Sequence, residues 1–423
     1  MTSSPRSKKI ALIGAGPASL SLAAILHRNH IPTTIYEAAS TLRHQGGSLD
    51  LHPQSGQLAL REAGLWEEFV RHARPECDCL KLMDLVDGKV CLDENENENE
   101  HGDVEAGIRE QVRSAQGVEA SLKGRPEIDR EILVRVLFGG VGKGSVKFGM
   151  KVESVKIGEK EEDGEEKYDI QFSDGTEEKG FDLVVGGDGA WSKVRRFLTH
   201  VGPVYSGISC VELWHSPTAA ANSQKNSDDA WFDAYVGKGS CFAFGDGCAL
   251  LAQRQGDGAT RTYACLRTPE SFLSTCGIDW TSPTALTSLT TRYFSHIAPP
   301  LLRLLSLSTA RLVPRTLYEL PLDFAWTARP GVTLIGDAAH LMTPFAGEGV
   351  NVGMGDAVVL AREIGMWVKG EKVVGEAVGA YEGEMRGRAR MAMKRTGRGK
   401  VGHFSEGGAE KMARRVREAK LGK

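Results

Sequence analysis

Residues 329–353 read RPGVTLIGDAAHLMTPFAGEGVNVG, and this stretch carries the clearest structural signal in the chain. Its apolar run, Val332–Ile335, stops at Gly336-Asp337, which predicts a buried strand that ends beside a ligand. A glycine-rich turn follows, and the pattern becomes helical from Val350 onward. Because a helix that opens on glycines offers free backbone N–H groups and the positive end of its dipole, the turn suits an electron-rich or anionic group. The carboxylate of Asp337 adds an acceptor for sugar hydroxyls.

A second glycine-rich turn lies near the N-terminus, between a strand at Lys8–Ile13 and helical periodicity over Leu20–His27. A further strand, Thr33–Tyr36, ends at Glu37, which lies 21 residues after Gly16, where an acid can bind ribose hydroxyls. The first two glycines permit a tight turn and the close approach of a pyrophosphate, while serine stands at the third glycine position. The pattern predicts a dinucleotide site made by Gly14, Gly16, Pro17, Ala18, Ser19 and Glu37.

Another motif lies between these two in the chain: it follows the apolar strand Phe181–Val185 and runs Asp188-Gly189-Ala190-Trp191-Ser192-Lys193-Val194-Arg195. Taken alone, this motif is equally compatible with a simple helix cap. A strand that leads into Asp-Gly and then a basic helix start also sets a carboxylate and loop amides beside a polar ligand.

Together, the three motifs resemble those of FAD-dependent aromatic hydroxylases, in the order and rough spacing of that family. In the family, the Asp-Gly-x-x-Ser-x-Val-Arg motif serves both FAD and the reduced nicotinamide cofactor. Other segments resemble tetracycline destructases, which are flavin monooxygenases that hydroxylate and inactivate tetracyclines: residues 46–52, 55–57, 125–130 and 336–351. The segment 205–265, which would line the substrate chamber, matches these enzymes poorly. Carried over by position, Arg43 would touch the nicotinamide cofactor, whereas Asp50, Arg130 and Asp337 would contact FAD.

The resemblance implies that FAD and NADPH are cofactors, that O2 adds to flavin carbon C4a, and that the hydroperoxide oxidises an electron-rich phenol or enol carbon. The implied substrate is a tetracycline-like or related polycyclic polyketide. Two alternatives stay open: a hydroxylase of single-ring, salicylate-type aromatics, which needs a cation facing the chamber, and an FAD-binding scaffold without turnover. No side chain is assigned as catalytic and no metal ligand is expected. The expected cofactor contacts are Gly14, Gly16, Pro17, Ala18, Ser19, Glu37, Arg43, Asp50, Arg130, Asp188, Gly336, Asp337, Pro344, Gly347, Gly349, Val350 and Asn351.

The length of 423 residues favours two domains. We expect an α/β fold: a Rossmann-like FAD-binding domain with a parallel sheet, interleaved with a β-sheet substrate domain and followed by a C-terminal helix. The expected bounds are 1–75, 107–200 and 321–370 for the first domain, 76–106 and 201–320 for the second, and 371–423 for the helical segment. Within them the pattern predicts a helix over Leu51–Val70 with a turn at Gly64-Leu65, a helix over Glu127–Phe138, a hairpin over 77–92, and an aromatic, β-rich segment from 201 to about 320.

The net charge of −3 gives no reason to expect nucleic acid. Residues 385–423 hold 13 Lys and Arg against 3 acidic residues, a local charge of +10 that leaves −13 for the other 384 residues. This basic segment is interpreted as the solvated face of a long helix packed across both domains, in preference to a membrane or nucleic-acid arm.

The remaining features predict an ordinary cytoplasmic protein. Eight scattered cysteines show no zinc spacing, which favours reduced thiols. No run approaches the ~18 apolar residues that span a bilayer, so stable membrane insertion is not expected. We expect a monomer with small-molecule partners, a disordered acidic loop at Asp93–Glu100, and a role for His340 in shaping the flavin loop rather than in a catalytic pair with Asp337.

Overall fold

The computed structural model describes residues 8–42, 46–95, 124–159, 166–217, 227–308 and 312–421. Its first layer is a five-stranded sheet in which every neighbouring pair is parallel. The strands, in spatial order, are β17 (Val332–Leu334), β11 (Leu183–Gly186), β1 (Ile10–Ile13), β2 (Thr34–Glu37) and β7 (Val146–Phe148). Because this sheet is covered on both faces, its strands are almost wholly apolar, as parallel sheets require. The predicted α/β fold is therefore confirmed.

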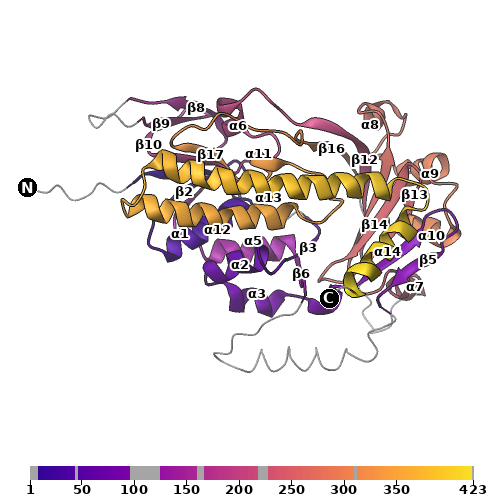
Figure 1. Ribbon diagram of the computed structural model, residues 1–423. Helices are drawn as coiled ribbons and strands as arrows, with labels where there is room; N and C mark the ends of the chain where they lie inside the picture. The colour runs from indigo at the N-terminus through magenta and orange to yellow at the C-terminus, as the bar shows by residue number, and fades with distance from the viewer. Residues whose placement is uncertain are drawn as a thin grey trace, which may run out of the picture.

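The helices α1 (Pro17–Arg28), α5 (Arg130–Gly139) and α12 (Gly349–Val368) pack beside this sheet (Figure 1). A small antiparallel sheet covers another part of it and consists of β8 (Val152–Ile157), β9 (Tyr168–Phe172) and β10 (Glu177–Phe181). Two predicted helices start later than the sequence suggested. The first begins at Gly56, and the predicted turn at Gly64-Leu65 is confirmed: Gly64 adopts a φ of +71° between α2 (Gly56–Glu62) and α3 (Trp66–His72). The second begins only at Arg130, because β6 (Glu127–Asp129) pairs with β3 (Ser48–Asp50).

The second layer is a seven-stranded sheet, at the right of Figure 1. Its spatial order is β16 (Val313–Glu319), β12 (Val204–His215), β15 (Thr260–Arg267), β14 (Cys248–Arg254), β13 (Ser240–Gly245), β4 (Leu80–Asp84) and β5 (Val90–Asp93). The predicted hairpin over 77–92 is confirmed as β4 and β5. The predicted β-rich segment from 201 to about 320 supplies five of these strands, and apolar helices that were not predicted cover one face of the sheet: α7 (Ser227–Val236), α9 (Ala285–Tyr293) and α10 (Pro299–Leu307).

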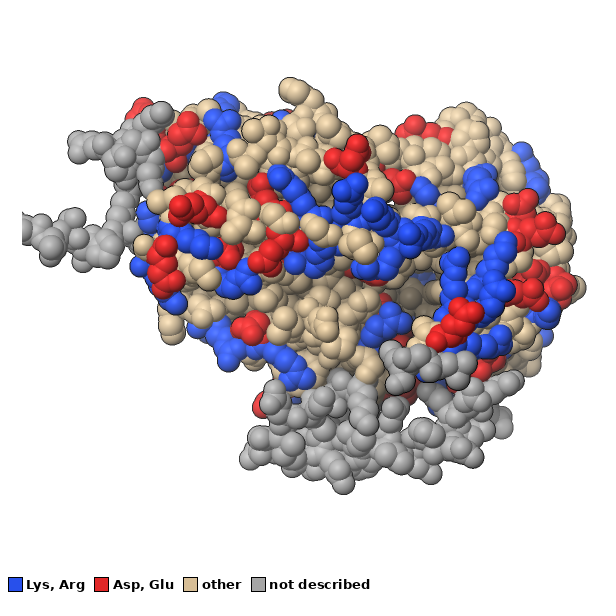
Figure 2. All heavy atoms as spheres, viewed as in Figure 1, with Lys and Arg blue, Asp and Glu red and all other residues tan. Residues whose placement is uncertain are grey.

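The C-terminal segment forms two helices, α13 (Val374–His403) and α14 (Gly408–Leu421). Helix α13 packs on α12 and β17, whereas α14 packs on β4, β5 and β13, so the helical segment contacts both layers but forms two helices and not the one long helix that was expected. Lys and Arg side chains gather along these two helices (Figure 2). Among the described residues, no helix is both long and apolar enough to cross a membrane.

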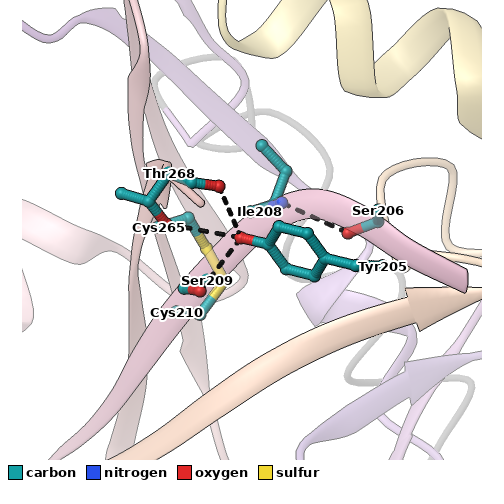
Figure 3. The surroundings of a disulfide bond; sticks show 7 residues. All are labelled: Tyr205, Ser206, Ile208, Ser209, Cys210, Cys265 and Thr268. Atoms are coloured by element: carbon teal, nitrogen blue, oxygen red, sulfur yellow. Dashed lines mark hydrogen bonds between the residues drawn. A yellow bond between two sulfur atoms is a disulfide. The ribbon is translucent and has the colours of Figure 1, made fainter. Parts of the chain in front are cut away.

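The expectation that all thiols are reduced was wrong, because Cys210 and Cys265 form a disulfide. The two cysteines lie directly opposite each other on the neighbouring strands β12 and β15, with 4.0 Å between their Cα atoms. Beside this bond, the hydroxyl of Tyr205 donates to the carbonyl of Thr268 at 2.8 Å (Figure 3). The other six cysteines are buried and form no disulfide.

Candidate functional site

The glycine turn after β1 is closely packed at Gly14 and open at Gly16. Gly14 has a φ of +92°, and a Cβ there would stand 2.6 Å from the carbonyl oxygen of Gly187, so only glycine fits. At Gly16, by contrast, an added Cβ would meet no atom of the described residues within 4 Å. The turn therefore presents an open cradle at the N-terminus of α1, as the close approach of a pyrophosphate requires.

Glu37 supports this turn from the end of β2. One carboxylate oxygen accepts the backbone N–H of Ala15 at 2.7 Å, and the other accepts that of Ala39 at 2.8 Å. The carboxylate thereby fixes the backbone between Gly14 and Gly16. Each carboxylate oxygen can accept more than one hydrogen bond, so these contacts leave capacity for ribose hydroxyls.

Two helix N-termini without side-chain caps converge on this cradle. Neither α1, with Gly16 at its N-cap, nor α12, with Glu348, has a side-chain cap hydrogen bond. The two helices pack closely because a Cβ added at Gly336 or at Gly353 of α12 would stand 3.2 Å from the side chain of Ala18. The first N–H groups of a helix have no partner within the helix, and its N-terminus is the positive end of its dipole, so this junction suits the phosphates and the electron-rich ring of a flavin nucleotide.

The third motif in chain order, the Gly336-Asp337 segment, places its carboxylate at the surface of an otherwise buried segment. Asp337 is exposed, whereas Gly336, Ala338, Ala339 and His340 are all buried. The exposed carboxylate at the end of β17 is thus available to hydroxyl groups of a ligand. Gly336 itself adopts a φ of +61°, a conformation that glycine adopts without strain.

The turn before α12 is fastened to β3 by Asn351. Its side-chain amide donates to the carbonyl of Asp50 at 2.8 Å and accepts the N–H of His52 at 2.8 Å. The carboxylate of Asp50 lies 3.3 Å from the Nη1 atom of Arg125 and would be 3.4 Å from a Cβ at Gly347. Five of the predicted cofactor contacts therefore lie close together: Asp50, Gly347, Gly349, Val350 and Asn351. Pro344 is exposed on the same loop.

Of the two predicted arginines, only Arg130 can be placed. It begins α5, and its N–H donates to the carbonyl of Gly47 at 3.2 Å. Its side chain lies against Gly46, whose φ of +148° leaves no room for a Cβ. Arg43 lies outside the described residues.

The Asp188 motif caps a helix and also contacts the other two motifs. Its carboxylate accepts the hydroxyl of Ser192 and the N–H of Lys193, each at 2.6 Å, at the start of α6 (Lys193–Leu198). Burial raises the pKa of Asp188 above its ordinary value. The buried guanidinium of Arg195 donates to the carbonyl of Ala338 at 3.0 Å and so ties this motif to the third one.

A buried ionic triad supports the third motif from behind. Asp356 of α12 is fully buried and accepts the Nε2 atom of His340 and the Nη2 atom of Arg388, both at 2.6 Å, as well as the N–H of Gly336 at 3.2 Å. Burial alone would lower the pKa of His340, but the Asp356 carboxylate more than offsets this effect and raises it. The histidine thus pairs with Asp356 and not with Asp337, in agreement with a role in shaping the loop.

The sequence reasoning missed the polar groups on the seven-stranded sheet. Arg261 of β15 is 4% exposed, and its Nη1 atom would lie 3.3 Å from a Cβ at Gly47. Its Nη2 atom lies 2.7 Å from the carboxylate of Glu212, while its Nε and Nη1 atoms have no hydrogen-bond partner in the described part of the chain. The rings of Trp214 and Tyr263 flank the guanidinium at 5.1 and 4.9 Å from its central carbon. The alternating pattern of strand β15 can be recognised in the sequence. The position of the Gly47 loop opposite this strand cannot.

The aromatic residues of segment 214–244 are divided between the two faces of this sheet. Trp231, Phe232 and Tyr235 lie on α7 and pack in the core on the side away from Gly47. Phe242 instead packs in the cluster that includes Phe345 of the third motif's loop. The sheet face that carries Phe242, Trp214 and Arg261 therefore meets the glycine loops.

A buried carboxyl at the junction of β3 and β6 gives a pH-dependent prediction. Burial raises the pKa of Glu127 to about 7, although Ser48 donates to its carboxylate at 2.7 Å. The stabilisation by the protonated form is complete below the ordinary pKa of 4.5 and is lost as the pH rises to about 7. We expect Glu127→Gln to stabilise the protein by about 1–3 kcal/mol at pH 8 and to change little at pH 4. Urea unfolding at both pH values measures this difference, and an equal effect at the two pH values would contradict it.

The open cradle at Gly16, the two uncapped helix ends and the exposed Asp337 fit an FAD molecule, and these features define the class as a flavin-dependent oxidoreductase. Residues 7–239 and 326–396 match the family model described as "FAD binding domain". The chain belongs to this family and is an FAD-dependent monooxygenase.

Known proteins support this assignment over the whole chain. Monooxygenase penA of Penicillium thymicola is 30% identical, and the alignment covers 96% of this chain and 97% of that protein. The structure of Klebsiella pneumoniae HpxO, complexed with FAD and uric acid, superposes with a TM-score of 0.72 at 20% identity and covers 97% and 93% of the two chains. Tetracycline destructase Tet(51) superposes with a TM-score of 0.63 at 18% identity and covers 95% and 93%. The destructase is one structural neighbour among several, so this likeness supports the fold alone.

Proposed function

We propose that the enzyme uses NADPH and O2 to hydroxylate an electron-rich carbon of a polycyclic phenol or enol, such as a tetracycline or a related polyketide. The observation that carries the substrate class is the sheet face opposite Gly47, where an ionic pair is set among aromatic rings. Apolar rings suit a fused aromatic substrate, and a few fixed polar groups suit its oxygen atoms. The likeness of residues 46–57 and 336–351 to tetracycline destructases supports the same class.

Bound FAD, once reduced, supplies the oxygen-activating chemistry, and the protein supplies position and electrostatics. In this proposal, Gly14, Gly16, Pro17, Ala18, Ser19 and Glu37 hold the nucleotide half of the cofactor, and Asp188 orders the adjoining turn. Asp50, Arg130, Gly336, Asp337 and Pro344 contact its remaining part, while the amides of Gly347, Gly349, Val350 and Asn351 stabilise negative charge on the ring. Arg43 contacts the nicotinamide cofactor.

Arg261 has a distinct role in this proposal. Burial alone would raise the pKa of Glu212, but Arg261, Trp214 and Arg315 lower it, so Glu212 is ionised and holds one edge of the guanidinium. The unpartnered Nε and Nη1 atoms then donate to a phenolate or enolate oxygen of the substrate. Because the ionised form of a phenol or enol is richer in electrons, this contact favours attack by its ring carbon.

The same arginine favours a second candidate, a hydroxylase of single-ring, salicylate-type acids. Such a substrate needs a cation at the chamber wall. Arg261 is a buried cation on the sheet face opposite Gly47. Its charge is shared with Glu212 at 2.7 Å, which makes it a weaker site for a full carboxylate than for a phenolate. We therefore rank the polycyclic substrate first.

A substrate panel distinguishes these candidates. Purified protein is mixed with NADPH and, in turn, tetracycline, other polycyclic phenols and salicylate, while NADPH absorbance and product mass are followed. We expect tetracycline to lose its absorbance and to gain the mass of one oxygen atom. Hydroxylation of salicylate with no change in tetracycline would reject the first candidate in favour of the second.

The proposal also keeps the expected division of the chain. Residues 1–75, 107–200 and 321–370 form the FAD-binding domain, residues 76–106 and 201–320 form the substrate domain, and residues 371–423 form the helical segment. The protein acts as a cytoplasmic monomer. Limited proteolysis and size-exclusion chromatography test the domain bounds and the monomer.

A further inference from the structure

Helix α13 has one face buried against the protein, and the opposite face of its C-terminal half is exposed. Its buried residues recur every three or four positions, as in Met385, Ala389, Ala392 and Thr396. At 100° per residue, the opposite face carries an arc about 100° wide. Its members are Arg390, Met391, Lys394, Arg398 and Val401, all of which are exposed.

The three cations of this arc differ from the other basic residues of the helix. Four other basic residues of the helix each form an ion pair with a carboxylate: Arg386, Arg388, Arg395 and Lys400. Within the described ranges, Arg390, Lys394 and Arg398 have neither an ion pair nor a side-chain hydrogen bond. Arg414 and Arg415 of α14 are also exposed, and Figure 2 shows Lys and Arg side chains continuing from α13 onto α14. The arc is therefore a continuous positive surface that the protein itself does not neutralise.

Two large apolar side chains lie on the same arc. Met391 is 54% exposed and Val401 is 64% exposed, so both project from the surface among the cations. Exposed apolar residues beside unpaired Lys and Arg are typical of helices that lie in the headgroup region of an anionic bilayer. A nucleic acid would match the cations but not the apolar side chains, and the arc has no aromatic ring on which a base could stack.

We propose that the outward face of α13 docks the enzyme peripherally on an anionic membrane surface. Arg390, Lys394 and Arg398 contact the lipid headgroups, while Met391 and Val401 enter the boundary between headgroups and acyl chains. The buried face of the same helix packs on the loop before α12, where Arg395 pairs with Glu348, whereas the five residues of the arc point outward. An aromatic substrate that partitions into lipid would be concentrated beside the docked enzyme.

The test is sedimentation of the full-length protein with vesicles. One set contains phosphatidylcholine alone, and the other contains equal parts of phosphatidylcholine and phosphatidylserine. We expect cosedimentation with the anionic vesicles only, weakened by added salt. The triple variant R390E/K394E/R398E should bind these vesicles roughly 100-fold more weakly. The matched control K143E/K151E/K156E changes three exposed lysines on and around the β7–β8 region and should bind like the wild type.

A second variant separates lipid from other polyanions. Met391→Ser with Val401→Ser leaves every charge in place and should lower vesicle binding while leaving heparin binding unchanged. Melting temperatures and FAD content, measured for all variants, show whether each one is folded. Equal vesicle binding by the two triple variants, failure of the wild type to bind anionic vesicles, or an unchanged vesicle affinity of the serine variant would overturn the proposal.

Discussion

Replacing Asp356 by asparagine is expected to lower the free energy of unfolding by about 3–5 kcal/mol. The substitution removes the only charge that faces both His340 and Arg388 at 2.6 Å within the described structure, and it leaves the buried His340 and the partly buried Arg388 without this counterion. The same carboxylate accepts the N–H of Gly336, so the loop that carries Asp337 should lose its fixed conformation. We therefore also expect weaker FAD binding, measured by flavin fluorescence on titration.

The matched control is Glu384→Gln, which also removes a carboxylate paired with an arginine, but at the surface. The partner of Glu384 is Arg362, and their side chains are 50% and 48% exposed. Exposed pairs contribute about 0–1 kcal/mol, so urea unfolding of this variant should differ little from the wild type. Similar losses of unfolding free energy in the two variants would show that the triad of Asp356, His340 and Arg388 does not support the Gly336-Asp337 motif.

Replacing Arg261 by methionine is expected to lower turnover by on the order of 100-fold, because it removes a buried, preorganised donor at the wall proposed to face the substrate. Methionine fills similar space without charge, so the fold and the FAD content should be retained. The variant leaves Glu212 with Arg315, which lies 3.0 Å away, and the carboxylate is therefore still paired. Steady-state NADPH oxidation with the best substrate of the panel measures the effect.

Arg315→Met serves as the comparison, because it removes the other cation of the same carboxylate from a site that is 43% exposed. We expect a much smaller loss of turnover from this variant. If both variants lose turnover equally, the role of Arg261 is to pair with Glu212 and not to contact the substrate.

The local motifs were predictable because each one is a short-range pattern. The strand–turn–helix at Ile10–Arg28 and the strand before Gly336 are encoded by adjacent residues, and both formed as predicted. Helix α13 was also predictable from its sparse apolar residues, since Met385 and Ala389 have helical spacing. These elements required no knowledge of the rest of the fold.

The errors arose where distant segments decide the structure. Residues 127–129 have a helical pattern, but they form a strand because β3, about 80 residues away, offers a partner. Arg261 was not distinguished from other arginines, because its partners Glu212 and Gly47 come from separate parts of the sequence. The disulfide was missed for the same reason: Cys210 and Cys265 are 55 residues apart and meet only through the register of β12 and β15.

The most direct test of the account is the FAD affinity of the variant Gly16→Thr. Gly16 has a φ of −78° and a ψ of 171°, which threonine adopts freely, and threonine is as good an N-cap residue as glycine. No atom of the described chain lies within 4 Å of the added Cβ, so the apoprotein should keep its melting temperature. If FAD occupies the cradle, the wild type will be yellow and bind one FAD, whereas the variant will fold but bind FAD poorly. A variant that binds FAD as tightly as the wild type, or a folded wild type that takes up no FAD, would contradict the account.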